Sequence, residues 1–525
     1  FERKAVFFDS VTAGEKGKMP LLFAAKSGKE KDALKVEIPV LKNAPEQTAA
    51  MFGRIDGTEE IPLDIPADSV LTLSVSPTVA NAKDSAIKAM IEYPYSCWEQ
   101  KISRAWAAAN AGEKWAGGRE FAQSVLDEIR SYQTPDGGMS YFVNFNGFDS
   151  PYLSAYTSYV LTRLKAKGFA VPPVAEEKLG AYLLRIFNGR KDVEMPTVVR
   201  ALSVPYLIKR GLIETADLEP LRRDLPKMTA FEKAVLYPYM PTDLLKDVYK
   251  TSGAVVVEED EEQSFSVLPS IAKTNCAVLQ ALPENRELMR GVLSLRGKNG
   301  TWGETQANAF CLDALDAYMA ASETAVDAKI SAKIGKKQVL DGTVAAKELK
   351  TAISFEQPET QTLTMTKTGQ GNPYYSAVLN YPSSTNGAVN AGLKVKRFYS
   401  VEQGGHFFRA QRRRIRRGQT VRVILEVTVP EFQSYVAVSD PVVGALEPLN
   451  SLQTDMVRRD GFYFKDSNFK RVTFYAEELP KGTYTLTYDA QVVAEGDFIA
   501  YPAKAEAMYL PDVFGLSETQ EVVVQ

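Results

Sequence analysis

The spacing of apolar residues changes twice along the 525-residue chain, and this pattern constrains the fold more than any other feature of the sequence. In residues 1–78, segments such as 70–75 alternate apolar and polar side chains, which is typical of half-buried strands. In residues 79–333, apolar side chains recur every three or four positions, which is typical of amphipathic helices. Beyond residue 334 the two-residue period returns, for example in 421–429. The sequence therefore predicts the order β, α, β, with a helical domain of about 250 residues in the middle.

Four segments follow from these changes of period. The leading β segment, 1–78, and the β segment after the helices, 334–388, are each too short for a comfortable core of their own. We therefore interpret the helical domain, 79–333, as an insertion into one β domain that is made from both flanks. The small residues of 387–392 indicate a linker, and 389–525 is predicted to form a β-sandwich.

Composition excludes several classes of function. Lys and Arg number 62 against 65 Asp and Glu, a formal charge of -3, so no basic field is available to hold nucleic acid. No apolar stretch is long enough for a membrane span. His406 is the one histidine, which argues against His-based metal sites and against Ser/His/Asp or Cys/His catalysis. The three cysteines form no Cys-x-x-Cys pair, so a zinc site is not indicated. We predict no metal, no cofactor and no nucleic-acid partner.

The most informative motif opens the helical domain, where residues 93–100 read Tyr-Pro-Tyr-Ser-Cys-Trp-Glu-Gln. Ser96 followed three positions later by Glu99 predicts a capping box, which places Cys97 at the first helical position and Gln100 one turn on. The Cys97 sulfur and the Gln100 side-chain carbonyl carbon can then meet, and loss of ammonia would join them as an internal thioester. The positive end of the helix dipole is expected to stabilise a Cys97 thiolate and so make it a better leaving group.

On the tetrapeptide alone, a buried thiol beside a capped helix is the stronger interpretation, because the Cys-x-Glu-Gln pattern arises by chance in roughly one sequence in a hundred. The surrounding sequence makes the thioester the stronger interpretation. The segment resembles the thioester motif of the alpha-2-macroglobulin and complement superfamily, and Tyr93, Pro94 and Tyr95 resemble the bacterial alpha-2-macroglobulins in particular. The resemblance continues through 136–141, 150–156, 301–308, 440–450 and 507–511.

This resemblance implies an α/α toroid thioester domain, inserted in a CUB-type β domain and followed by a macroglobulin-like β-sandwich. Residues 1–78 would hold the end of a macroglobulin domain and the first half of the CUB-type domain, and 334–388 its second half. The toroid would be 79–333 and the C-terminal macroglobulin domain 389–525.

The resemblance also implies a single-use protease inhibitor and not an enzyme. In the family, cleavage of a bait region uncovers the thioester, and a lysine amine of the attacking protease is acylated. Gln100 would become the attachment point and Cys97 the leaving group. No bait region is identifiable in this sequence, so the chain would be the capture half. The helical domain contains no histidine, and we therefore expect transfer to amines in preference to hydroxyls.

Several aromatic residues are candidates for shielding the thioester. Trp98, together with Tyr93 and Tyr95, would exclude water, although ordinary core packing explains the Trp98 ring equally well. Glu99 would support the motif. By the resemblance, a tyrosine of the terminal domain covers the thioester, and Tyr509 is our candidate, with Tyr501 close by in the sequence.

The chain begins at Phe1 without an initiator Met or a signal peptide, and we expect it to be a processed or truncated piece. The resemblance implies a periplasmic lipoprotein whose lipid anchor lies on a preceding part and holds it to the inner membrane. We expect a monomer. Cys276 and Cys311 are predicted to be buried thiols, although an exported protein could pair them. The basic run of 409–417 is predicted to be a solvated strand edge.

Two other functions stay open. The first is a surface-binding or adhesion module, in which the thioester is lost or attaches the protein to surface amines instead of trapping proteases. The second is a cyclase or prenyltransferase, since α/α toroids also host such enzymes. Those enzymes require acid clusters or zinc ligands, which the sequence does not supply.

Overall fold

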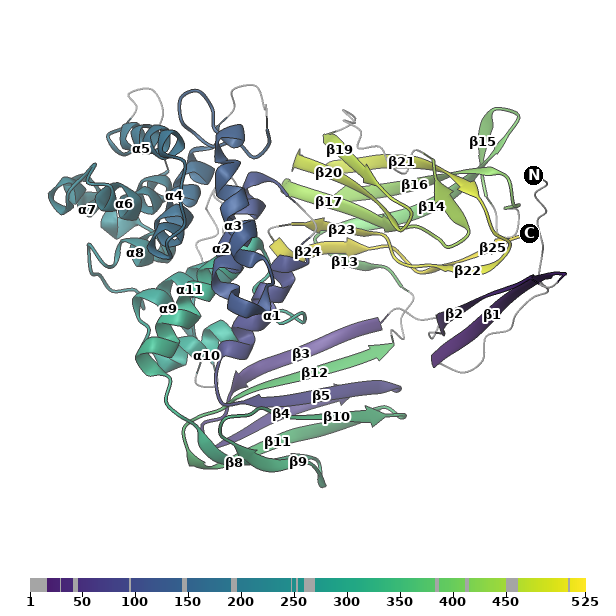
Figure 1. Cartoon of the computed structure of the whole chain (residues 1–525), viewed down its shortest axis with the longest axis horizontal. Helices are drawn as coiled ribbons and strands as arrows, with labels where there is room; N and C mark the ends of the chain where they lie inside the picture. Colours follow the sequence, from purple (N-terminus) through teal and green to yellow (C-terminus); the bar gives the residue numbers. More distant parts are fainter. Residues whose placement is uncertain are drawn as a thin grey trace.

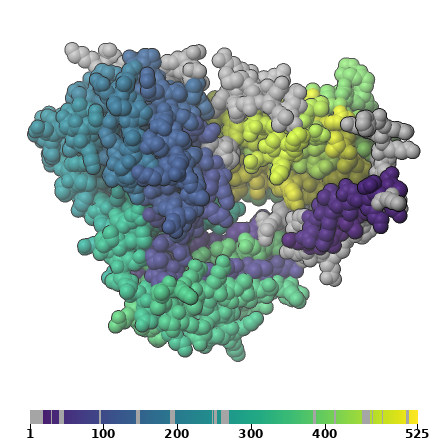
Figure 2. All heavy atoms as spheres, viewed as in Figure 1, coloured from purple at the N-terminus to yellow at the C-terminus, as the bar shows by residue number. Residues whose placement is uncertain are grey.

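Buried apolar side chains of the described residues form three separate cores, one in the helices and one in each of two β domains. The structure is a computed structural model, and it describes residues 17–28, 30–40, 46–93, 96–143, 149–189, 196–246, 248–251, 254–258, 270–382, 387–410, 415–449, 461–508 and 510–525. The helical domain and the terminal β domain lie side by side, and the other β domain lies below them in the view (Figures 1 and 2).

Both flanks of the helical region contribute strands to the first β domain. Its strands are β3 (Glu46–Arg54), β4 (Thr58–Ile65), β5 (Ser69–Ser76), β8 (Asp327–Ile334), β9 (Lys337–Val344), β10 (Leu349–Phe355), β11 (Glu359–Gln370) and β12 (Tyr374–Pro382). They form two four-stranded antiparallel sheets in the orders β10-β5-β12-β3 and β4-β11-β8-β9. Strands from before and after the helices therefore pair directly, and the helical domain is an insertion in one β domain, as the alternating apolar pattern predicted.

The helices form a closed double ring. The inner ring consists of α2 (Trp98–Ala111), α4 (Pro151–Ala166), α6 (Thr197–Lys209), α8 (Ala230–Leu236), α9 (Ile271–Ala281) and α11 (Thr305–Ser322). Each of these packs on the next, and α11 closes the ring on α2. The outer helices are α1 (Ala80–Ile91), α3 (Gly118–Asp127), α5 (Pro173–Phe187), α7 (Glu219–Asp224) and α10 (Arg286–Ser294), with the short strands β6 (Val248–Thr251) and β7 (Ala254–Val257) beside α10. The predicted α/α toroid is confirmed.

Two inner helices are joined covalently. Cys276 of α9 and Cys311 of α11 form a disulfide, with their Cα atoms 4.9 Å apart. The expectation of two separate thiols is therefore wrong, because adjacent ring helices bring these residues face to face. Within the described residues, none of the helices is long and apolar enough to span a bilayer.

The terminal domain is a β-sandwich. Its strands are β13 (Val389–Ala391), β14 (Lys394–Gln403), β15 (His406–Arg409), β16 (Thr420–Val429), β17 (Gln433–Pro441), β18 (Leu446–Pro448), β19 (Phe462–Ser467), β20 (Arg471–Leu479), β21 (Gly482–Val492), β22 (Gly496–Ala500), β23 (Lys504–Ala507), β24 (Leu510–Leu516) and β25 (Gln520–Val524). One sheet has the order β13-β24-β23-β17-β20-β19 and the other β15-β14-β16-β21-β18, while β22 pairs with β25. Buried and half-buried residues alternate along β16, so one face of this strand packs into the core between the two sheets.

A separate hairpin precedes these domains. It consists of β1 (Gly17–Ser27) and β2 (Glu30–Val40), paired antiparallel. Leu22 and Leu34 are 70% and 62% exposed, and none of the hairpin's described residues belongs to the three cores. The assignment of this region to the end of a macroglobulin domain stays a prediction. Four residues of the predicted basic run, 411–414, lie outside the described residues.

A buried ion pair crosses the core of the terminal domain. Arg397 donates to Asp440 at 2.6 Å, and both side chains are almost fully buried. Arg397 also donates to the backbone carbonyls of Ala500 and Tyr501, and Tyr488 donates its hydroxyl to Asp440. These hydrogen bonds compensate both buried charges, although the Nε of Arg397 has no hydrogen-bond partner. Loss of either charge would therefore leave the other without a counter-ion in the buried core.

Asp440→Ala is expected to destabilise the terminal domain by about 3–5 kcal/mol, because Arg397 would stay buried without a counter-ion. Peptide-level hydrogen exchange would report this as faster exchange of the slowest amides in β16 and β17. The matched control is Asp489→Ala, which breaks the partly exposed pair with Arg422 and should cost about 0–1 kcal/mol. Equal effects of the two substitutions would contradict the assignment.

Candidate functional site

The start of α2 positions the predicted thioester residues. Cys97 has an extended backbone, with φ −64° and ψ 166°, and is the N-cap of α2. Its backbone N–H donates to the side-chain oxygen of Gln100 at 3.1 Å. The predicted capping box of Ser96 and Glu99 is therefore wrong by one residue. The physical reason is that the Glu99 carboxylate turns inward to bind Thr305 and does not reach back along the chain.

Cys97 and Gln100 lie together at the start of α2. The Gln100 side-chain oxygen accepts the N–H of Cys97, and the backbone N–H groups of Gln100 and Glu99 point at the Cys97 sulfur. The next N–H of the helix, that of Trp98, donates to the backbone carbonyl of Tyr141 at 2.8 Å. The unpaired donors of the helix start therefore find partners locally, in part on the side chains of Cys97 and Gln100, and the thioester between these residues stays a prediction.

Electrostatics at Cys97 disfavour a thiolate in this arrangement. Cys97 keeps some surface exposure, yet protein surrounds its sulfur, and this burial raises the pKa of the thiol. The charge of Glu99 raises it further, whereas the N–H groups of Gln100 and Glu99 lower it. The N–H groups at the helix start lower the pKa of Cys97, which is the predicted direction, but burial raises it by more.

Glu99 is fully buried among hydroxyl groups. Thr305 Oγ1 donates to Oε1 at 2.7 Å and lies 3.0 Å from Oε2, while Ser103 Oγ lies 3.1 Å from Oε1. Ser103 also contacts the hydroxyl of Tyr156 at 2.7 Å. Burial raises the pKa of Glu99 to about 7, the Thr305 hydrogen bond opposes this shift, and the charge of Glu304 adds to it. Burial therefore keeps the Glu99 carboxyl group protonated to higher pH than an exposed glutamate.

A second layer of buried polar groups lies behind Glu99. Glu304 caps α11 by accepting the N–H of Ala307 at 2.8 Å, and burial raises its pKa while the charge of Lys273 lowers it. Lys273 donates to the hydroxyl of Tyr152 at 3.0 Å, and Tyr152 donates to Gln306 at 2.7 Å. The N-terminal ends of α2, α4, α9 and α11 thus meet around the Cys97–Gln100 pair.

Sequence analysis missed Thr305, Glu304 and Lys273 as parts of the site. A partial signal existed for the first two, because 301–308 was noted for its resemblance, and Glu304 stands directly before a helical period. Lys273 gave no signal, since its burial depends on its packing against Tyr152 and Phe231 of other elements.

The predicted shielding residues differ in their placement. Trp98 is fully buried, donates its indole N–H to Thr157 at 2.9 Å and packs on Tyr132 with ring centroids 4.9 Å apart. It anchors α2 in the toroid core, which is the core-packing alternative. Tyr93 is half-buried just before α2. Tyr95 and Tyr509 lie outside the described residues.

The terminal domain brings a different tyrosine to this region. Tyr435 of β17 packs against Tyr141 with ring centroids 6.2 Å apart, and its carbonyl accepts the N–H of Met508 at 2.9 Å. Tyr435 and Met508 both pack on the core of the helical domain. Tyr435 has a φ of 52°, in the left-handed region that a bulky residue rarely adopts. Nothing in the two-residue period of β17 could have indicated this geometry.

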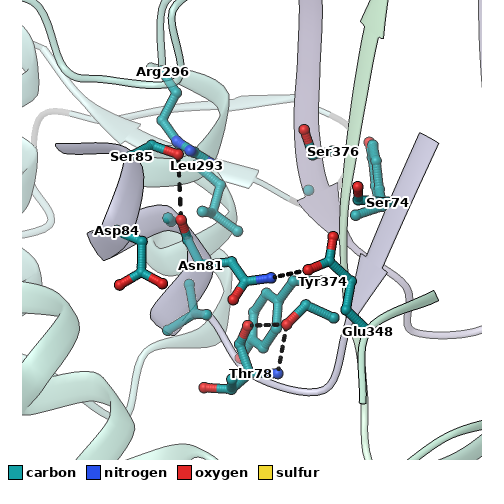
Figure 3. Close-up of a pocket in the computed structure, with 15 residues that line it drawn as sticks. Ser74, Thr78, Asn81, Asp84, Ser85, Leu293, Arg296, Glu348, Tyr374 and Ser376 are labelled. Carbon is teal, nitrogen blue, oxygen red and sulfur yellow. Dashed lines mark hydrogen bonds between the residues drawn. The ribbon is translucent and has the colours of Figure 1, made fainter. Parts of the chain in front are cut away.

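A polar cavity of about 320 Å³ lies elsewhere, between the first β domain and α1 (Figure 3). Ser74 and Ser376 approach it from paired strands, Arg296 from the loop after α10, and Asn81 donates to Glu348 at its mouth. None of the predicted thioester residues lines it. Among the described residues, no group of three or more His, Cys, Asp or Glu could hold a metal ion.

Comparisons with known proteins agree with this architecture. Residues 392–512 match the family model of the bacterial alpha-2-macroglobulin MG10 domain. An alpha-2-macroglobulin homolog from a Nostoc species is 23% identical over 549 aligned residues, which cover 95% of this chain and 28% of the relative. Native Escherichia coli alpha-2-macroglobulin, solved from domain MG7 to the C-terminus, has 18% identity and a TM-score of 0.70 over 94% of this chain and 84% of that one. Salmonella alpha-2-macroglobulin reacted with methylamine has 18% identity and a TM-score of 0.68, over 95% and 35%.

The terminal β domain, which contains residues 392–512, is similar to the MG10 domain of bacterial alpha-2-macroglobulins. The chain as a whole is similar to the C-terminal portion of bacterial alpha-2-macroglobulins in sequence and in fold. It spans 28% of the length of the Nostoc relative.

Glu99→Gln is expected to change how stability depends on pH. The pKa of Glu99 rises from 4.5 to about 7 in the folded state, so the folded chain keeps this proton after the unfolded chain has lost it. Stability is therefore lost as pH rises through this window. The melting temperature of the wild-type chain should fall relative to that of Glu99→Gln between about pH 5 and 7.5, measured by scanning calorimetry. A constant difference would show that Glu99 titrates normally.

Proposed function

We propose that this chain is the capture part of a protease inhibitor that traps its attacker covalently through a thioester between Cys97 and Gln100. The observation that carries the proposal is the placement of the Gln100 carboxamide on the N–H of Cys97, with the Cys97 sulfur at the same helix start. Similarity to bacterial alpha-2-macroglobulins supports the inhibitory role. The inhibitor is consumed in the reaction and does not turn over.

Two balanced steps make up the chemistry. In the first, the Cys97 thiol and the Gln100 carboxamide condense to a thioester and release ammonia. In the second, a lysine amine of the protease attacks the Gln100 carbonyl carbon, a carbon–nitrogen bond forms and the carbon–sulfur bond breaks. The amine nitrogen loses one proton and the Cys97 sulfur gains one. The product is an isopeptide bond at Gln100 and a free thiol at Cys97.

The contact between the terminal domain and the helical domain supplies the control that such a trap needs. A thioester exposed to water hydrolyses, so it must stay covered until a protease is present. Tyr435 and Met508 pack on the helical domain, and Tyr435 contacts Tyr141, whose carbonyl holds the N–H of Trp98. Displacement of the terminal domain would remove this cover. We infer that bait-region cleavage in another part of the protein triggers that displacement.

The disulfide supports an exported location. Disulfides persist in oxidising compartments, and the Cys276–Cys311 bond joins two ring helices beside the site. We propose a periplasmic, monomeric protein, anchored to the inner membrane by a lipid on a preceding segment.

Mass spectrometry of the fresh protein tests the thioester. We expect an intact mass about 17 Da below the sequence mass, which is the mass of one ammonia, and no free thiol at Cys97. Methylamine should then label Gln100 and release the Cys97 thiol. The similar Salmonella alpha-2-macroglobulin has been solved after reaction with methylamine. Cys97→Ala is the matched control and should show neither change. A wild-type mass equal to the sequence mass, with an alkylatable Cys97, would contradict the proposal.

Incubation of the complete protein with trypsin tests trapping. Denaturing electrophoresis should reveal a heat-stable conjugate whose cross-link joins Gln100 to a trypsin lysine, and Cys97→Ala should give none. Labelling of Gln100 by small amines without any protease conjugate would favour the surface-attachment alternative instead.

Tyr435→Ala is expected to speed thioester loss on the order of tenfold, because it removes the ring that contacts Tyr141 and admits water and amines. Thiol release with time, with and without methylamine, measures the effect. Tyr435→Phe keeps the ring and should behave like the wild type. Tyr501→Ala is the control in the same domain, since the Tyr501 side chain is 41% exposed. Equal rates in all four proteins would show that Tyr435 does not cover the site.

A further inference from the structure

We propose that Glu99 is a positioning residue whose proton controls the reaction: when its carboxyl group ionises, Cys97 becomes a poorer leaving group and transfer of the Gln100 acyl group slows. This inference rests on the proposed thioester and adds a dependence on pH to it. The residues involved are Glu99, Glu304 and Lys273, which lie at the N-terminal ends of α2, α11 and α9 and act on one another through their charges.

The geometry holds the Glu99 carboxyl group in one place. Glu99 and Cys97 belong to the same helix start, two residues apart. Thr305 of α11 bonds both carboxyl oxygens, and Ser103, one turn along α2, bonds the first of them. Because Ser103 is itself held by the hydroxyl of Tyr156 from α4, the carboxyl group has fixed partners on three ring helices. Its charge therefore acts on the sulfur from a constant position.

The charged and titratable groups around Glu99 come from every element packed on it. Glu304 faces it from α11 and disfavours its ionisation, and Lys273 of α9 offsets the charge of Glu304. Burial raises the pKa of Tyr156 of α4, and of Tyr141 on the segment before α4, well above 10, and the charge of Glu99 raises both further. Both hydroxyl groups therefore stay protonated. Burial raises the pKa of Glu99 to about 7, and it raises the pKa of Glu304 as well.

The charge of Glu99 affects acyl transfer because the Cys97 sulfur itself becomes negatively charged during the reaction. As the carbon–sulfur bond breaks, negative charge develops on the Cys97 sulfur before it gains the proton that the amine loses. The ionised form of Glu99 raises the pKa of Cys97 through its charge and so opposes that development. Protonated Glu99 lacks the charge while keeping its hydrogen-bond partners. Glu99 does not transfer the proton itself; it changes the field in which the sulfur leaves.

The test compares rates of thiol release by methylamine in the wild type and in Glu99→Gln, from about pH 5.5 to 8.5. The ratio of the two rates cancels the protonation of methylamine itself. The variant should match the wild type at low pH, where Glu99 is neutral, and become faster by on the order of tenfold above pH 8, one pKa unit being a tenfold change. The midpoint should lie near 7. A ratio that does not change with pH would overturn the inference, because a purely structural role does not titrate.

Two further variants keep the Glu99 carboxyl group and move its midpoint in opposite directions. Thr305→Val removes the hydrogen bond that favours the ionised form, so the break in the pH–rate profile should move to higher pH. Glu304→Gln removes the neighbouring charge and should move the break to lower pH. These shifts serve as the readout if Glu99→Gln fails to fold. Profiles that do not move, or that move the same way, count against the proposal.

Failure of the thioester can be told apart from failure of this inference. If the intact mass shows that no thioester forms, the same three variants are compared in the alkylation of the Cys97 thiol by iodoacetamide over the same pH range. A break near pH 7 that is absent in Glu99→Gln would support the coupling between Glu99 and Cys97 in a protein without a trap. An alkylation ratio that stays constant with pH would overturn the coupling as well.

Discussion

The first turn of α2 is the constraint on which the rest of this structure depends. A helix start leaves backbone donors without partners, and here the motif itself satisfies them. The Gln100 side chain accepts the N–H of Cys97, the sulfur of Cys97 faces the donors of Glu99 and Gln100, and Tyr141 takes the N–H of Trp98. Ordinary helix capping thus brings Cys97 and Gln100 together, because each side chain accepts a backbone N–H at the same helix start.

Tyr435 joins the terminal domain to the helical domain in a strained backbone conformation. A bulky residue in the left-handed region costs on the order of 1–2 kcal/mol, and Tyr435 has this conformation inside a strand. The ring contact with Tyr141 crosses to the helical domain, whereas the hydrogen bond with Met508 lies within the terminal domain. Separation of the two domains would therefore remove the contact with Tyr141 and leave the hydrogen bond with Met508 in place.

The sequence was sufficient for the architecture and for placing Cys97 and Gln100 at one helix start, but not for the surroundings of these two residues. Apolar periods decide helix or strand over long segments, so the inserted toroid and the terminal sandwich could be predicted. The residue at which α2 begins could not be predicted, because Ser96–Glu99 and Cys97–Gln100 both fit a capping box. Thr305, far away in the sequence, decides between them by holding Glu99. The pairing of Cys276 with Cys311 likewise depends on which ring helices become neighbours.

The direction of the inner helices explains how the end of the ring that holds Cys97 can bury two carboxyl groups. Helix N-termini converge there, and their positive dipole ends reduce the cost of burying the carboxyl groups of Glu99 and Glu304. At the other end, a cavity of about 400 Å³ is lined by Arg163, Lys167 and Lys209 near the C-terminal ends of α4 and α6, and also by Asp313 and Asp316 of α11. Helix C-termini favour the cations among these charges, and Asp313 pairs directly with Arg163. The ring thus provides one end suited to buried acids, and that end carries Cys97 and Gln100.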